Sequence, residues 1–186
     1  MSAGPDITRE ASRLDALYRA KARAEIDAAE ALAHTSQPVR CQGDELADVL
    51  LVKGEPGAAD LAEGIALAGE DGVAAGKALD ALGAPAQRFA LCTRLPEVAD
   101  DVRLERLALI VETVDPRIVI ALDPLAARDI ADACEIEPLA PGVLSSWRGR
   151  SILAVDGLEA SLSDETLKRR VWAQLKTLAA LTDLVT

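Results

Sequence analysis

Apolar residues along the chain follow two patterns that alternate, and the alternation predicts an α/β fold. Four short runs are almost continuously apolar, which is typical of strands buried on both faces of a sheet. These runs span residues 48–52, 88–93, 116–122 and 150–155. Segments with apolar residues three and four positions apart predict helices at 70–83, 97–114, 123–134 and 163–185. The repeated order of strand and helix predicts a three-layer α/β/α sandwich around a four-stranded parallel sheet.

Capping residues mark the ends of several of these helices. Asp123 can accept hydrogen bonds from the first turn of its helix, and Pro124 suits the first helical position. Gly83 can end the helix that precedes it. Ser163 is the expected N-cap of the last helix, whose apolar stripe should be buried.

The first 36 residues predict a helical extension that precedes an α/β domain at 37–186. Residues 7–33 contain neither Gly nor Pro, and apolar residues recur along them at spacings of three and four: Ile7, Ala11, Leu14, Tyr18 and Ala22. Such a helix either packs along the edge of the domain or forms a partner-binding or dimerising arm, with Tyr18 as a contact residue. The polar segment 34–45, which contains Pro38 and Gly43, would link the helix to the domain.

Composition and charge argue against a nucleic-acid-binding protein. The 186 residues carry a formal net charge of −11, and only 2% of them are aromatic. A protein that grips phosphates uses Lys and Arg to release counterions, and single-strand binding grooves stack bases on aromatic rings. We therefore expect a protein partner, with nucleic-acid binding weak or absent.

The cysteines and the hydropathy pattern predict a cytoplasmic protein. Cys41, Cys92 and Cys134 are far apart and include no CxxC pair, which disfavours a disulfide framework or a zinc ribbon and predicts inert, reduced thiols. The chain has no 18-residue apolar run, and its polar N-terminus does not look like a secretory signal. These observations predict no membrane association, no metal and no cofactor.

A Gly-rich turn after the first predicted strand is the best candidate for a site. The stretch "VLLVKGEPGAADLAEG" runs from an apolar strand through Lys53 into a Gly-Glu-Pro-Gly turn. Glycines let backbone approach a ligand closely, and the N–H groups of such a turn can bind a phosphate or the edge of a base. In a parallel sheet the loops after the strands meet at one edge. Residues 53–57, 92–96, Asp123 and 156–157 should therefore converge on one crevice.

The glycines after this strand resemble a motif of a known family. Pro56-Gly57, Gly64, Gly69 and Gly72, followed by "KALDALG", resemble the first motif region of the uracil-DNA glycosylase superfamily, most closely its thermostable iron–sulfur type. "VDPRIVIALDPLAARDIA", "RGRSILAVDG" and "KRRVWAQLK" resemble later segments, so that the resemblance covers residues 48–178. It implies a uracil-DNA glycosylase-like fold and a crevice that holds an extruded base by stacking and edge hydrogen bonds.

The resemblance also assigns positions to individual residues. Asp60 matches the acidic residue that would orient an attacking water, and Glu55 precedes it in the turn. Leu67 falls where the family has a stacking aromatic, Cys92 near its base-reading asparagine, and Asp156 near its anion-stabilising histidine. Four cluster cysteines are needed and three exist, so no iron–sulfur cluster is expected. The implied crevice residues are Lys53, Gly54, Pro56, Gly57, Leu67, Cys92, Asp156 and Gly157.

Two functions follow from these substitutions. The first is a non-catalytic glycosylase-like protein that acts as a protein-interaction module, associated by resemblance with DNA replication or repair, with Tyr18, Trp147 and Arg148 as interface candidates. The alternative is a DNA glycosylase or nucleoside hydrolase of altered base specificity that uses Asp60 and Glu55. An open crevice reached by Asp60 would favour the enzyme, and a crevice closed by Leu67, Cys92 and Asp156 would disfavour it. A generic α/β sandwich with the same segment order is a third interpretation.

Overall fold

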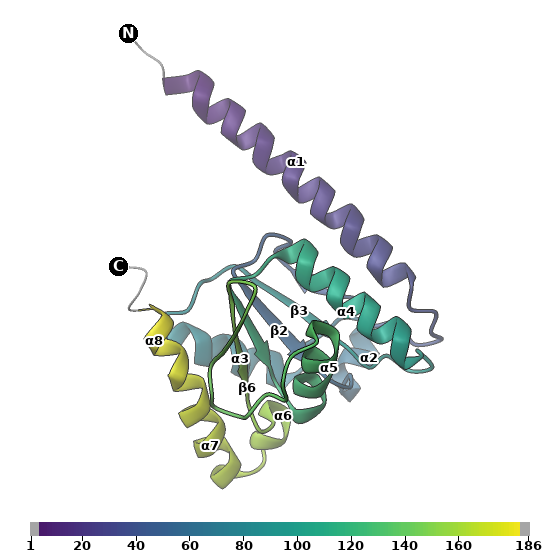
Figure 1. The fold of residues 1–186 in the computed structure, drawn as a ribbon, viewed down its shortest axis with the longest axis vertical. Coiled ribbons are helices and arrows are strands. Elements are labelled where there is room, and N and C mark those ends of the chain that lie inside the picture. Colours follow the sequence, from purple (N-terminus) through teal and green to yellow (C-terminus); the bar gives the residue numbers. More distant parts are fainter. Residues whose placement is uncertain (1–3, 183–186) are drawn as a thin grey trace.

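The computed structural model describes residues 4–182 and shows an α/β architecture in which helices lie on both faces of one sheet (Figure 1). The strands are β1 (Gln42–Gly43), β2 (Val49–Lys53), β3 (Arg88–Cys92), β4 (Ile118–Ala121), β5 (Ser145–Trp147) and β6 (Arg150–Ala154). The helices are α1 (Gly4–Ala31), α2 (Ala58–Glu63), α3 (Glu70–Ala81), α4 (Asp100–Val114), α5 (Pro124–Cys134), α6 (Leu158–Ser161), α7 (Glu165–Leu175) and α8 (Ala179–Thr182), with a 3₁₀ turn, η1, at Lys176–Leu178.

The sheet is six-stranded and mixed, so the predicted sheet of four parallel strands is wrong in its extent. The strand order is β1-β3-β2-β4-β6-β5. The four predicted strands lie at the centre and pair in parallel, whereas β1 and β5 pair antiparallel at the two edges. The edge strands have two and three residues and are partly exposed. Strands this short contain no apolar run by which the sequence could reveal them. They form because the neighbouring strand offers hydrogen-bond partners.

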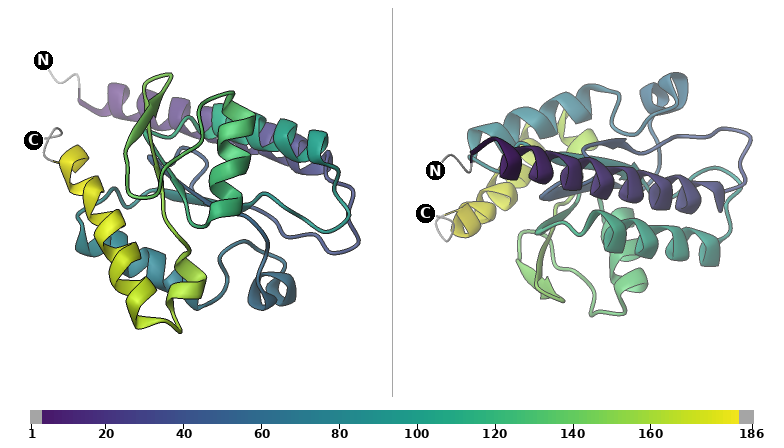
Figure 2. Two further views of the ribbon diagram at one scale, coloured as in Figure 1. Left: turned by 60° about the horizontal axis from the view of Figure 1, so that its bottom comes forward. Right: turned by 90° about the horizontal axis from the view of Figure 1, so that it is seen from above.

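Side chains of the central strands pack into two separate apolar clusters, one on each face of the sheet. Leu50 and Val52 point to one face of the sheet, which α1, α4 and α5 cover. Val49 and Leu51 point to the other face, which α3, α6 and α7 cover. Figure 2 shows these helix layers on either side of the sheet. Because both faces are covered, polar positions do not alternate with apolar ones along these strands, which is why the sequence shows uninterrupted apolar runs.

Several helix boundaries differ from the sequence-based expectation. Helix α4 begins at Asp100 instead of residue 97, because Glu97 has a φ of 67° and lies in the preceding turn. Asp164, and not Ser163, caps α7 by accepting hydrogen bonds from the N–H groups of Thr166 and Leu167. The predicted helix at 163–185 is divided into α7, η1 and α8, and residues 183–185 lie outside the described range. Helices α2 and α6 were not predicted, because six and four residues are too few to show a period.

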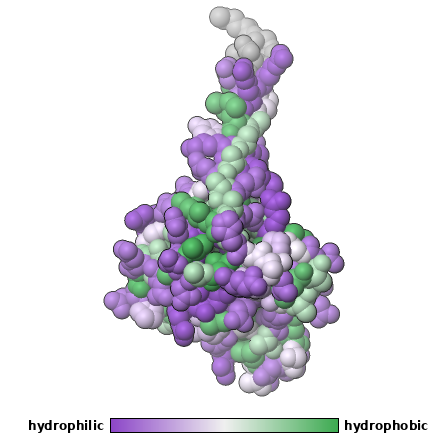
Figure 3. Space-filling view, turned by 90° about the vertical axis from the view of Figure 1, so that its right-hand side faces the viewer, coloured by the Kyte–Doolittle hydropathy of each residue, from purple (hydrophilic) through white to green (hydrophobic). Residues whose placement is uncertain are grey.

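Helix α1 packs against the domain along only part of its length. Its C-terminal half packs against the domain through Ala22, Ile26 and Ala29, which are almost fully buried. Its N-terminal half projects beyond the body of the molecule (Figures 1 and 3). Ion pairs from Arg19 to Asp44 and from Arg23 to Glu45 mark where the helix meets the body. Among residues 4–182, no helix has the length and apolar character needed to cross a bilayer.

Asp123 connects the start of α5 to the turn after β2, so its replacement tests the packing of this region. One carboxylate oxygen accepts the N–H groups of Leu125 and Ala126, and the other accepts the N–H of Gly54 at 2.7 Å. We expect Asp123→Ala to lower the free energy of unfolding by about 2 kcal/mol, because it removes a helix cap and leaves a buried N–H unpaired. Urea denaturation measures the loss.

Asp123→Asn is the matched control for this variant, because it keeps one acceptor oxygen in the same place. Its loss should be clearly smaller than that of Asp123→Ala. Equal unfolding midpoints for the wild type and Asp123→Ala would contradict the role assigned to this carboxylate.

Candidate functional site

A cleft of about 480 Å³ lies beyond the carboxyl ends of three central strands. Residues at or after the end of β2, after β4 and after β6 line it: Lys53, Glu55, Asp71, Leu122, Asp123, Pro124, Leu125, Asp156, Gly157, Leu158, Glu159 and Ala160. Parallel strands end at the same edge of a sheet, so the loops converge there. The predicted convergence thus holds for three loops, whereas residues 92–96 after β3 are not part of the lining.

Lys53 is the chemical centre of this region. Its ammonium nitrogen lies 2.8 Å from Asp60, 2.7 Å from Asp71 and 2.8 Å from Glu159. The lysine and the two aspartates are each at least 95% buried, and Glu159 is exposed. Burial by itself would lower the pKa of Lys53, but the hydrogen bonds to the three carboxylates outweigh it and the pKa is raised. Lys53 is therefore held charged and is already surrounded by acceptors.

Asp60 is fully engaged inside the protein. One of its carboxylate oxygens accepts from Lys53 and from the N–H of Gly57, and the other accepts from the N–H of Ala68 at 2.8 Å. It is the third residue of α2, where an acidic side chain bonded back to the N-cap N–H stabilises the helix start. Asp60 does not line the cleft. Its role here is to fold the turn, and its carboxylate is not placed to orient a water in the cleft.

The turn glycines have close neighbours from the protein itself. A Cβ added to Gly54 would lie 2.7 Å from both an Asp123 carboxylate oxygen and the Leu125 Cβ. A Cβ on Gly57 would lie 2.7 Å from the Glu159 carboxylate and 2.9 Å from the Lys53 nitrogen. Glycine is thus required at Gly54, where the turn packs against the start of α5, whereas at Gly57 the neighbours are the ends of two long side chains. Pro56, between them, is partly exposed and is not a lining residue.

Leu67 and Cys92, expected at the crevice, lie in the apolar core. Both belong to the cluster beneath the face of the sheet that α3, α6 and α7 cover. Cys92 is completely buried, and burial raises the pKa of its thiol to about 12. Leu67 is 7% exposed, with a φ of 54°. The cleft is therefore open, and it is not closed by the contact of Leu67, Cys92 and Asp156 that the sequence suggested as one outcome.

Asp156 and Gly157 do line the cleft, as expected. The Asp156 carboxylate accepts from the Gln174 amide at 2.9 Å and from Arg170 at 3.4 Å, and its own N–H donates to the Gln174 oxygen. Gly157 has a φ of 147°, a conformation that side chains disfavour. Glu55 is exposed at the rim. Of the two proposed catalytic carboxylates, only Glu55 can contact a molecule in the cleft.

The cleft carries a strong negative charge. Its lining contains five carboxylates, on Glu55, Asp71, Asp123, Asp156 and Glu159, and one lysine, which gives a formal charge of −4. A concave surface of one sign concentrates the field and repels ligands of the same sign. The cleft therefore disfavours phosphate groups. Among residues 4–182, no group of three or more His, Cys, Asp and Glu side chains is placed to hold a metal ion.

A second buried ion cluster explains why the loop after β3 stays outside the cleft. Asp129 of α5 is fully buried and accepts from Thr93 at 2.5 Å and from two nitrogens of Arg94 at 3.0 and 2.7 Å. The hydrogen bond to Asp129 raises the pKa of Arg94. Arg103 lies 3.4 Å from the same carboxylate. These contacts tie the loop to α5.

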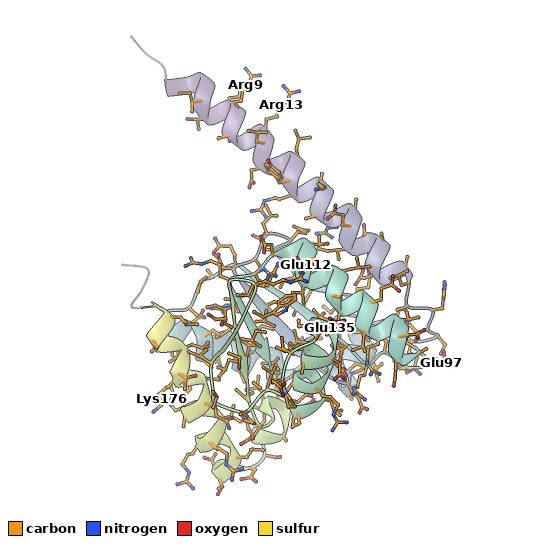
Figure 4. The ribbon with its side chains drawn as sticks, viewed as in Figure 1. Arg9, Arg13, Glu97, Glu112, Glu135 and Lys176 are labelled. Carbon is orange, nitrogen blue, oxygen red and sulfur yellow. The ribbon has the colours of Figure 1, made fainter. Side chains whose placement is uncertain are left out.

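The three interface candidates have different surroundings. Trp147 packs against the core, and the guanidinium groups of Arg148 and Arg150 lie 4.8 and 5.1 Å from its ring centre. Glu112, labelled on α4 in Figure 4, pairs with both arginines. The partly buried indole is therefore stacked between protein groups and is not a free anchor, whereas Arg148 is exposed. Tyr18 is 61% exposed on the projecting half of α1.

Sequence reasoning missed two members of the site, Asp71 and Glu159. It also missed the second contact of Asp123, whose carboxylate accepts the N–H of Gly54. One signal could have located the cluster, because Lys53 ends a strand that is otherwise apolar and a buried lysine requires carboxylate partners. Asp60 follows Lys53 by seven residues and lies in the first turn of the next element, α2. Glu159 had no comparable signal, because α6 has four residues and its position depends on the whole sheet.

No protein-family model matches this sequence, and no curated protein matches it. The resemblance to uracil-DNA glycosylases therefore depends on the glycine spacing and segment order of this chain, and what it implies about function remains a proposal.

Lys53 is the residue whose loss should damage the fold most at this site. Lys53→Met leaves Asp60 and Asp71 buried without their cation, and we expect the free energy of unfolding to fall by about 3–5 kcal/mol. Lys77→Met, on the exposed face of α3, is the matched control and should change it by about 0.5 kcal/mol or less. Chemical denaturation of both variants measures the difference. Similar small losses in the two variants would show that Lys53 is not a structural cation.

The three thiols, of which Cys92 and Cys134 are buried and Cys41 is partly buried, give a second test. Burial raises the pKa of Cys41 and Cys92 to about 12 and that of Cys134 to about 11. Cys134 has the smallest shift and sets the rate, so at pH 8 the folded protein should react with a thiol reagent about a hundredfold more slowly than the urea-unfolded chain, which should react at three sites. Rapid reaction of the folded protein would contradict this burial.

The raised pKa of Cys92 also predicts how the stability of the fold changes with pH. The unfolded thiol loses its proton near pH 9, whereas the folded thiol of Cys92 keeps it until about pH 12. The folded state thus binds more protons above pH 9, and the stability contributed by this group should be complete below pH 9 and be lost as the pH rises towards 12.

Proposed function

We propose that this protein is a non-catalytic, uracil-DNA glycosylase-like protein that acts by binding another protein. The family likeness rests on the glycine motif and on the order of the central strands and helices. On that resemblance, its place is in DNA replication or repair.

One observation carries the non-catalytic part of the proposal. Among the described residues that line the cleft, none has an aromatic ring, an amide side chain or an imidazole, and the lining carries a formal charge of −4. An extruded base is held by stacking and by hydrogen bonds to its polar edge, and the departing base is stabilised as an anion by donors. Carboxylates can accept a hydrogen bond from an N–H of a base, but they cannot stack on its ring or donate to the departing anion. The energy that would distinguish a transition state from free substrate is therefore missing.

The charge of the cleft supports the same conclusion. DNA carries a negative charge for every 1.7 Å or so of its axis, and a protein that holds it must neutralise phosphates. Lys53, the one cation in the lining, lies within 2.8 Å of three carboxylates. Its charge is neutralised by them and is not available to bind a phosphate. A DNA strand entering this cleft would be repelled.

A second candidate function is hydrolysis of a neutral or cationic nucleoside with Glu55 as the acting carboxylate. Its supporting observation is the open cleft, whose size of about 480 Å³ lies in the usual range for small-molecule sites. Asp60, the other carboxylate that the sequence suggested for this reaction, is held inside the protein and does not line the cleft. Incubation with nucleosides, followed by chromatography for the free base, tests it against Glu55→Gln.

The decisive test of the proposed function is an excision assay on uracil-containing single- and double-stranded DNA. We expect no free uracil from the wild type or from Glu55→Gln, an exposed substitution that leaves the fold intact. Fluorescence anisotropy with the same DNA at about 50 and 200 mM salt should show no salt-dependent binding, because the acidic cleft releases no counterions. Release of uracil by the wild type that Glu55→Gln abolishes would overturn the proposal.

A further inference from the structure

The projecting half of α1 carries an apolar stripe that has no partner within the described part of the molecule. Ile7, Leu14, Leu17 and Tyr18 are large apolar side chains that are 50–69% exposed. In Figure 3 apolar surface continues along this part of the helix and reaches the body at its base. Arg9 and Arg13 point away from the body in Figure 4, which leaves the stripe on another side of the helix. A stripe of this kind on a water-exposed helix is typical of a helix that packs against another one.

We propose that this stripe is a self-association surface, on which the α1 arm of a second copy of the same chain packs antiparallel. The inference depends on α1 alone and not on the chemistry of the cleft, so it goes beyond the function proposed above.

The spacing of the stripe is compatible with an antiparallel pair. Ile7, Ala11, Leu14 and Tyr18 are separated by four, three and four residues, a series that reads the same in both directions. When one arm is reversed against another, Ile7 lies opposite Tyr18 of the second copy, and Ala11 lies opposite Leu14. The two inner pairs thus set a small side chain against a large one, and the two outer pairs set Ile7 against Tyr18, so that the large side chains can interdigitate along the line where the two helices meet.

The residues that flank the seam are compatible with this register. The antiparallel arrangement places Glu10 beside Leu17 of the second copy and Asp15 beside Thr8. Like charges therefore do not face each other next to the seam.

Charge distribution argues against a parallel pair. Residues 1–21 contain four Lys and Arg and three Asp and Glu, which gives a net charge of +1. Since the whole chain has a net charge of −11, residues 22–186 have a net charge of −12. A parallel pair would bring two strongly acidic bodies side by side. An antiparallel overlap of residues 7–18 places them at opposite ends of a paired segment about 18 Å long, beyond the Debye length of about 8 Å at physiological salt.

The area available sets the strength of the complex. Four large apolar side chains per copy, each half or more exposed, can bury on the order of 1,000 Å² over two copies, which is near the lower limit for a specific interface. We therefore expect a reversible dimer with a dissociation constant on the order of 10 μM.

Sedimentation equilibrium of the full chain tests the inference. The wild type should pass from monomer to dimer as its concentration rises through the range around 10 μM. Leu14→Glu should weaken the dimer at least tenfold, because it places a charge in the seam. Ala16→Glu adds the same charge on the opposite side of the helix and should leave the dimer unchanged. Both positions are exposed in the monomer, so equal urea midpoints will show that the fold is intact.

Cysteine cross-linking tests the direction of the pair in a Cys41→Ser background. A tagged chain with Ala11→Cys and an untagged chain with Leu14→Cys should form the mixed disulfide faster than either forms a disulfide with itself. Faster formation of the symmetric Ala11→Cys disulfide would overturn the antiparallel register.

A wild type that is monomeric throughout, or a similar loss in Leu14→Glu and Ala16→Glu, would overturn the dimer. Either result would leave the proposed function standing, because that function is tested by uracil release and not by the oligomeric state.

Discussion

The ion cluster around Lys53 is the interaction on which the rest of the structure depends. It joins the end of β2 to α2 through Asp60, to α3 through Asp71 and to α6 through Glu159. A buried lysine is tolerated only when carboxylates compensate for its lost hydration, and here three do. The turn, the first two helices after it and the α6 segment are thereby fixed at one edge of the sheet.

This cluster also shapes the cleft and limits its chemistry. Lys53 is held by its own carboxylates, and the rest of the lining combines five acidic residues with apolar ones such as Leu122, Leu125 and Leu158. Gly54 of the turn is needed because Asp123 and Leu125 approach its backbone so closely. A sequence motif that resembles a ligand-binding turn thus has a structural explanation within this chain.

The N-terminal helix is stabilised by a different interaction. Ala22, Ile26 and Ala29 are buried against the body, and salt bridges from Arg19 and Arg23 reach Asp44 and Glu45. Towards its N-terminus the helix projects from the body (Figure 1), and the side chains of Ile7, Leu14, Leu17 and Tyr18 are exposed. The arm is nearly neutral while the body is strongly acidic, so the two parts present different surfaces to a partner.

The sequence by itself determined the central strands, most of the long helices and the cap at Asp123, because these depend on local periodicity and on short-range hydrogen bonds. Through the rule that loops after parallel strands converge, it also located the turn and the cleft residues Lys53, Glu55, Asp123, Asp156 and Gly157, but wrongly included residues 92–96. Only the tertiary structure decided the edge strands, the burial of Leu67 and Cys92, and the partners of Lys53 and Asp60. Those features arise from contacts between residues far apart in the chain, for which a single sequence carries no periodic or local signal.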